Sequence, residues 1–121
     1  MDFILTLLLV LIALLHILFM LLEMLLWTKP LGRKVFGLTE SYALSSQTLA
    51  ANQGLYNGFL AAGLVWSVWS GQFSVQLFFL CCVFIAGMFG ALTVSRKIFW
   101  VQALPAILAL LVLFQTQAPV Q

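Results

Sequence analysis

The chain has 121 residues, of which 64% are apolar and 7% charged, and its formal net charge is +2. Soluble domains carry about 25% charged residues, so this composition excludes a globule with a charged, water-facing surface. The small net charge also excludes the broad basic surface of a nucleic-acid-binding protein. The length fits one integral membrane domain over residues 1–121, at about 20 residues for each helix that crosses the bilayer.

The first predicted element is a transmembrane helix over residues 3–27. The apolar run is longer than the apolar segment of a secretory signal peptide. No basic residue precedes it, and it ends at Trp27 without a cleavage site of small residues. We therefore expect a retained helix that spans the bilayer.

A polar connector follows, and it contains several signals for turns and helix ends. The residue before a proline is disfavoured in helical conformation, so Pro30 is expected to end the first helix. Gly32 and Gly37 predict turns. Thr39 is a suitable N-cap, and Glu40 lies in the first turn, where the helix dipole favours an anion. The second long helix is therefore expected to begin near Thr39, before the membrane.

Three further spans follow this connector, because a helix in lipid satisfies its own backbone polar groups. Gly71 marks a short turn between the second and third spans, and a basic turn separates the third from the fourth. The predicted fold is an all-α, polytopic membrane protein with a bundle of four transmembrane helices. The predicted spans are residues 3–27, 49–69, 75–94 and 98–114, with the first connector at residues 28–48.

The basic residues predict the orientation in the bilayer. All five lie in the first and third connectors, which are cytoplasmic by the positive-inside rule. Met1 and Gln121 are then expected on the non-cytoplasmic side, and the predicted location is the bacterial inner (plasma) membrane. The basic residues are Lys29, Arg33, Lys34, Arg96 and Lys97.

Polar residues inside the predicted spans gather in the cytoplasmic half. Glu23 lies about 6 Å inside the cytoplasmic boundary marked by Trp27. The polar residues of the second and fourth spans lie about 5 to 12 Å inside the same boundary; they are Asn52, Gln53, Asn57 and Gln102. His16 is about 16 Å deep and shares a helix face with Glu23, seven residues away. This asymmetry predicts a polar pocket that opens to the cytoplasm. Its candidate ligand-binding residues are His16, Glu23, Asn52, Gln53, Asn57 and Gln102.

The leading functional hypothesis is that this pocket binds a small amphipathic or lipid-like molecule by its polar head. One alternative is an enzyme on a lipophilic substrate, with Glu23 as general acid or base and His16 as helper. A second is a small transporter that relays protons through these two residues. A third is a structural subunit, in which the polar residues only bond neighbouring helices. No cofactor or metal is expected, since the adjacent Cys81 and Cys82 fit no metal or redox motif.

Small residues recur every four positions in the second predicted span. Such a ribbon lets another helix approach closely, either within the bundle or from another subunit. A homo-oligomer is therefore expected, in addition to contact with the lipid bilayer. The ribbon consists of Ala50, Gly54, Gly58 and Ala62.

Residues 22–28, 32–39 and 51–61 together resemble the bacterial and fungal family called domain of unknown function 1304. The stretch Asn-Gln-Gly-Leu-Tyr-Asn-Gly at residues 52–58 is the most specific part. The resemblance implies a small integral membrane protein of unknown activity.

The order of spans, the orientation and the segment Gln-Ala-Leu-Pro at residues 102–105 are faintly similar to the membrane-associated eicosanoid and glutathione metabolism proteins. That likeness implies a four-helix trimer with a ligand bound from the cytoplasmic side. The glutathione-binding charges of those proteins have no counterpart in the second and third predicted spans here. Glutathione chemistry is therefore not expected.

Overall fold

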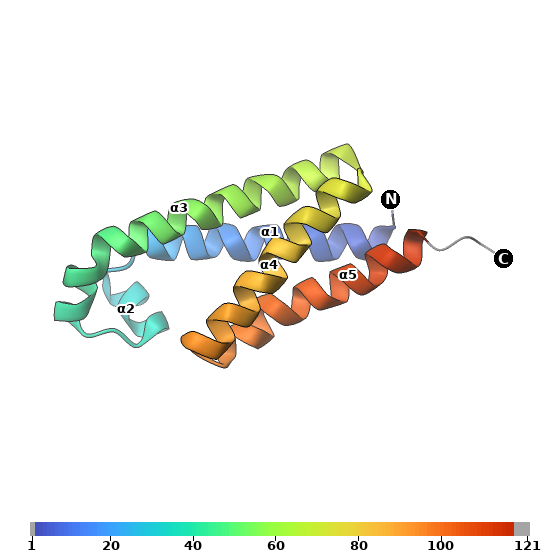
Figure 1. The fold of residues 1–121 in the computed structure, drawn as a ribbon. Helices are drawn as coiled ribbons and strands as arrows, with labels where there is room; N and C mark the ends of the chain where they lie inside the picture. The colour runs from blue at the N-terminus through green and yellow to red at the C-terminus, as the bar shows by residue number, and fades with distance from the viewer. Residues whose placement is uncertain (1, 118–121) are drawn as a thin grey trace. The chain divides into compact units, whose positions relative to one another are not determined.

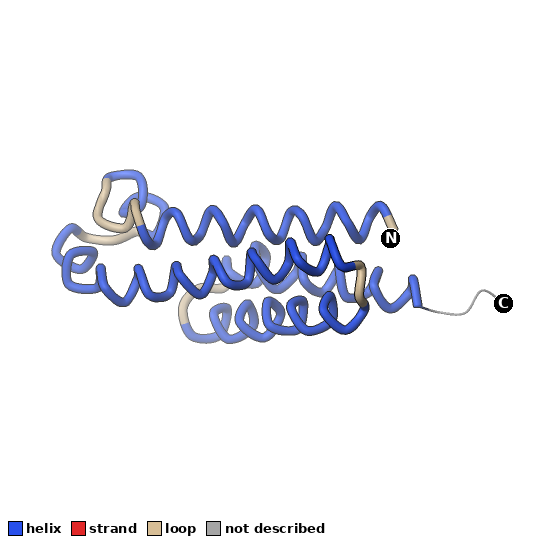
Figure 2. Tube along the Cα trace, turned by 90° about the horizontal axis from the view of Figure 1, so that it is seen from above, coloured by secondary structure: helices blue, strands red, loops and turns tan. Residues whose placement is uncertain are grey.

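The computed structural model describes residues 2–117, which form helices joined by short turns (Figures 1 and 2). The described residues contain no strand, which confirms the predicted all-α class. Met1 and Gln121, whose side of the membrane the sequence predicts, lie outside the described residues. The elements are α1 (Phe3–Met24), α2 (Pro30–Phe36), α3 (Glu40–Ser70), α4 (Phe73–Thr93), the π-helical segment η1 (Phe99–Ala103) and α5 (Leu104–Gln117).

Three helices in the described part of the chain are long and apolar enough to cross a membrane. They are Phe3–Met24, Phe73–Thr93 and the continuous segment Phe99–Gln117. The second predicted span, residues 49–69, is not among them and lies within α3, where Asn52, Gln53 and Asn57 lower the hydropathy. A membrane protein is thus supported, and this second span remains a prediction.

The helices group into two compact units. The first contains the described residues of Met1–Ala13 and Ala62–Gln121, and the second is Leu14–Ala61. The single domain expected from the sequence remains a prediction. The core of the first unit combines α1, α3, α4 and α5, and its fully buried members include Leu9, Leu64, Leu80, Val83 and Leu113.

A tight turn joins α3 to α4 in the first unit. Gly71 has a φ of 64°, a left-handed conformation that favours glycine, and so the predicted turn is confirmed. Gln76, at the start of α4, donates from Nε2 to the Ser67 carbonyl of α3 at 3.3 Å. Both residues are buried. The polar pair thus satisfies hydrogen-bonding groups that burial would otherwise leave unpaired.

Gly87 brings α4 against η1. A Cβ at Gly87 would lie 2.7 Å from the Ala103 nitrogen and 2.9 Å from its Cα. Because these are backbone atoms, only glycine fits. Gly87 is therefore a packing position of α4.

The last predicted span, residues 98–114, begins with the π-helical segment η1. The Leu104 N–H donates to the Phe99 carbonyl, five residues earlier. Pro105 has no N–H to continue an α-helical ladder, and its ring crowds the preceding turn. A wider turn before the proline accommodates this ring.

In the second unit, α1 ends at Met24 instead of at Pro30, which corrects the sequence prediction. The N–H groups of Leu25 and Leu26 both donate to the Leu21 carbonyl, at 3.0 and 3.2 Å, and this closes the last turn. Pro30 instead begins α2, where a missing N–H has no consequence. Lys29 is extended, with φ −81° and ψ 158°, as expected before a proline.

The short helix α2 was not predicted. Gly32, expected to mark a turn, lies inside α2 and is buried, and a Cβ there would collide with the Leu26 carbonyl. Gly37 ends α2 with a φ of 66°, and so its predicted turn is confirmed. The Tyr42 N–H donates to Thr39 Oγ1 at 3.2 Å, which confirms Thr39 as the N-cap of α3.

Candidate functional site

The central contact of the second unit joins Glu23 of α1 to Asn57 of α3. Asn57 Nδ2 donates to Glu23 Oε1 at 2.5 Å, and both residues are half-buried. The structure thus brings together two of the six predicted site residues, Glu23 and Asn57. A carboxyl group within a candidate membrane span is costly without a partner, and the amide supplies one.

Two glycines allow α1 to approach α3 at this contact. A Cβ at Gly54 would lie 2.6 Å from Met24 Cγ and 3.1 Å from Glu23 Cβ. A Cβ at Gly58 would lie 2.8 Å from Met20 Sδ. The predicted small-residue ribbon therefore serves helix packing within the chain at these two positions.

The other four predicted site residues are placed differently. Asn52 and Gln53 are exposed on α3. His16 is buried at 1% exposure, and its ring packs edge-on against that of Phe19 with centroids 5.6 Å apart. His16 also makes a further interaction. Gln102 lies in η1 of the first unit and also has a partner. The ligand-binding role of all six residues remains a prediction.

A second polar contact, which the sequence did not predict, ties the end of α1 to α3. Trp27 Nε1 donates to Ser46 Oγ at 3.0 Å, and Ser46 Oγ donates to the Tyr42 carbonyl at 2.6 Å. The Trp27 ring also packs against Phe36 of α2, with centroids 5.0 Å apart. The sequence predicts Trp27 only as the end of the first span. Its indole N–H, which needs a partner when buried, was the available signal.

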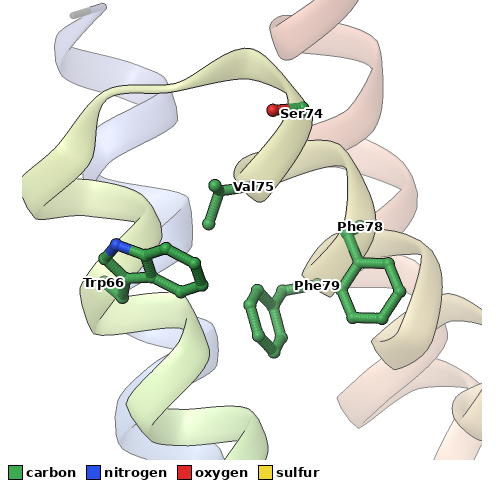
Figure 3. A pocket seen from close by; sticks show the side chains of 5 residues that line it. All are labelled: Trp66, Ser74, Val75, Phe78 and Phe79. Carbon is green, nitrogen blue, oxygen red and sulfur yellow. The ribbon is translucent and has the colours of Figure 1, made fainter.

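An apolar pocket lies beside the α3–α4 turn of the first unit, and no predicted site residue lines it (Figure 3). Its volume is about 230 Å³, and its lining is Trp66, Ser74, Val75, Phe78 and Phe79. Figure 3 shows the aromatic rings and Val75 around one hollow. Ser74 is the one lining residue with a polar uncharged hydroxyl, and so this pocket suits an apolar group. The sequence feature that could have indicated this pocket is the group of aromatic residues on both sides of the turn at Gly71.

In the part of the chain that the structure describes, no three His, Cys, Asp or Glu side chains gather as a metal site. The two cysteines are free thiols on α4. At the Glu23–Asn57 contact, the carboxyl group offers acceptor oxygens, and the amide offers both a donor and an acceptor.

A family model described as a protein of unknown function (DUF1304) matches residues 10–114. The chain belongs to the DUF1304 family. The match includes α2, α3, α4 and both residues of the Glu23–Asn57 contact. The resemblance found in the sequence is thereby confirmed.

One similar curated protein is the uncharacterized protein YpaA of Lactococcus lactis subsp. lactis (strain IL1403). It is 38% identical over 69 residues, which are 55% of this DUF1304 chain and 58% of YpaA. The chain thus spans a little over half the length of that relative. No solved structure matches the chain.

Proposed function

We propose that this DUF1304 protein is a four-span membrane protein that binds a small amphipathic or lipid-like molecule at Glu23 and Asn57. The observation that carries the proposal is the hydrogen bond between these two side chains, because it holds a carboxyl group inside a candidate span. Side chains at this depth that can both donate and accept are suited to orient a polar head group. Apolar side chains of the neighbouring helices take the tail.

The chemistry of the pair favours a head group that carries hydroxyl or amine donors. Asn57 occupies one oxygen of the Glu23 carboxyl group. The second oxygen is the acceptor that we assign to the head group, and the Asn57 side-chain carbonyl is a second acceptor. Met20 and Met24 of α1 lie close to this pair, where α1 packs against Gly54 and Gly58 of α3. Flexible methionine side chains adapt to ligands of different shapes.

The proposed topology has α3 as the fourth span and both termini on the non-cytoplasmic side. Figures 1 and 2 show the start of α1, the α3–α4 turn and the end of α5 at one end of the first unit. Phe73 and Phe114 pack there with centroids 5.8 Å apart. The α3–α4 turn carries no Lys or Arg, which supports a non-cytoplasmic position for this end in a bacterial inner membrane.

We also propose a homo-oligomer, with a trimer as the expected state. The exposed amides of Asn52 and Gln53 support it, because each amide both donates and accepts and can therefore pair with a second copy. Native mass spectrometry of the protein in mild detergent and in nanodiscs measures the state. A monomer under both conditions would remove the oligomer from the proposal.

The ligand is tested by purifying the protein from its membrane and identifying the small molecules that it retains, by native mass spectrometry and solvent extraction. We expect an amphipathic molecule with a hydroxyl or amine head on the wild-type protein. The Glu23→Gln variant should retain at least about tenfold less, since a bond to a charged group contributes about 1.5 to 3 kcal/mol. Glu40→Gln, which changes an exposed acid at the start of α3, is the matched control.

Equal retention by Glu23→Gln and the control would reject Glu23 as the ligand-binding residue. A wild-type protein that retains only bulk membrane lipids, in their membrane proportions, would reject the binding function itself. Circular dichroism in detergent checks that both variants keep their helices.

A further inference from the structure

The short helix α2 has an inner face that fixes it to the end of α1. Gly32 is buried against the Leu26 carbonyl, and Phe36, one turn later, packs on Trp27. Trp27 is in turn hydrogen-bonded to Ser46 of α3. All of these contacts lie within the second unit. They place α2 directly after a candidate membrane span that ends at Met24.

The outer face of α2 is apolar and exposed. Leu31 and Val35 are four residues apart, so they share one side of the helix. Their exposed fractions are 56% and 54%. Leu25, in the turn that leads from α1, is exposed as well, at 65%. An exposed apolar strip that continues from a membrane span is expected to lie at the lipid boundary.

Basic side chains flank this strip. Lys29, Arg33 and Lys34 lie within six consecutive residues, and Lys29 and Lys34 are exposed. The chain has no acidic residue between Glu23 and Glu40. The segment therefore carries an uncompensated positive charge beside an apolar face, which is the pattern of helices that lie on anionic membranes.

The guanidinium group of Arg33 needs an acceptor. Its Nε is buried and has no hydrogen-bond partner among the residues that the structure describes. Arg33 as a whole is half-buried, so part of its side chain is accessible to an acceptor from outside the chain. A phosphate group suits the planar, forked donors of arginine best.

We infer that α2 is an interfacial helix that binds the phosphate of an anionic phospholipid in the cytoplasmic leaflet. Leu31 and Val35 enter the boundary between head groups and acyl chains. Arg33, with Lys29 and Lys34, holds the phosphate. This surface is separate from the ligand proposed at Glu23, and it rests on the proposed topology, in which α1 spans the membrane and α2 lies on the cytoplasmic side.

The test titrates the full-length protein in a zwitterionic detergent with phosphatidylglycerol or phosphatidylcholine and counts bound lipids by native mass spectrometry. We expect phosphatidylglycerol to bind more tightly to the wild-type protein. The Arg33→Gln/Lys34→Gln variant should bind phosphatidylglycerol about 25-fold more weakly than the wild-type protein does, since each basic residue near an anionic surface contributes about fivefold to the affinity. The matched control is Arg96→Gln/Lys97→Gln, which removes the same charge from the turn after α4.

Equal binding of the two lipids by the wild-type protein would overturn the inference. Equal losses in the two double variants would also overturn it, because net charge alone would then explain the preference. Leu31→Ser/Val35→Ser keeps every charge and should weaken phosphatidylglycerol binding as well. An unchanged affinity in that variant would reject the insertion of α2 into the lipid boundary.

Discussion

At the scale of single residues, the Glu23–Asn57 hydrogen bond is the central contact of the second unit, because it gives a partner to a carboxyl group inside a candidate span. We predict that Asn57→Leu destabilises the protein by about 1 to 3 kcal/mol, since the carboxyl group then loses its partner. Gln47→Leu is the control, because Gln47 is an amide exposed on the same helix and has no role in the proposed contacts. Reversible unfolding in mixed micelles, followed by circular dichroism, measures both.

A double variant separates the hydrogen bond from general packing. Glu23→Leu/Asn57→Leu removes both polar groups and should be less destabilising than Asn57→Leu alone, because no buried group is left unpaired. Additive losses in this cycle would contradict a direct interaction between the two side chains.

The glycines make a second prediction at this scale. Gly87→Ala should destabilise the protein by about 1 to 3 kcal/mol, because the new methyl group meets the Ala103 backbone. Gly58→Ala should have a smaller effect, because the nearest atoms belong to the flexible Met20 side chain. The same unfolding assay measures the loss of stability in both variants. An equal loss in the two, or a larger loss in Gly58→Ala, would count against the close approach of α4 and η1.

At the scale of elements, the start of α3 is set locally by Thr39. Its Oγ1 accepts the Tyr42 N–H at 3.2 Å. We predict that Thr39→Ala costs about 1 kcal/mol, the usual effect of removing an N-cap. Ser45→Ala is the matched control, because the Ser45 hydroxyl bonds a carbonyl within the helix, that of Tyr42. Amide hydrogen exchange should show faster exchange in the first turn of α3 for Thr39→Ala only.

The end of α1 shows the limit of local signals. Pro30 requires only that Lys29 leave the helical conformation, and Lys29 does so. The helix ends five residues earlier, because the chain turns back to place Gly32 on the Leu26 carbonyl and Phe36 on Trp27. Those contacts join different elements, and no residue within the apolar run 3–27 predicts them.

At the scale of the whole molecule, the proposed orientation makes a direct prediction. A phosphatase fused to the C-terminus should be active and a fluorescent protein fused there should be dark, since the C-terminus is expected outside the cytoplasm. Fusions after Lys97 should show the opposite pattern. Fluorescence from the C-terminal fusion would show that the assigned orientation is wrong.

The sequence by itself determined the all-α class, the family, the N-cap at Thr39 and the turn at Gly71. These depend on composition, on neighbouring residues or on a single backbone conformation, and so they need no knowledge of the packing. The sequence also showed that Glu23 requires a polar partner near the end of its helix.

Only the tertiary structure decided that this partner is Asn57, while Asn52 and Gln53 are exposed. The choice depends on the rotation of α3 about its axis. That rotation is fixed where Gly54 and Gly58 admit Met24 and Met20 of α1. Asn57 lies three residues after Gly54, on the same helix face, so it turns toward α1 with the glycines. The periodicity of one helix defines its faces, but the shape of a second helix selects which face is buried.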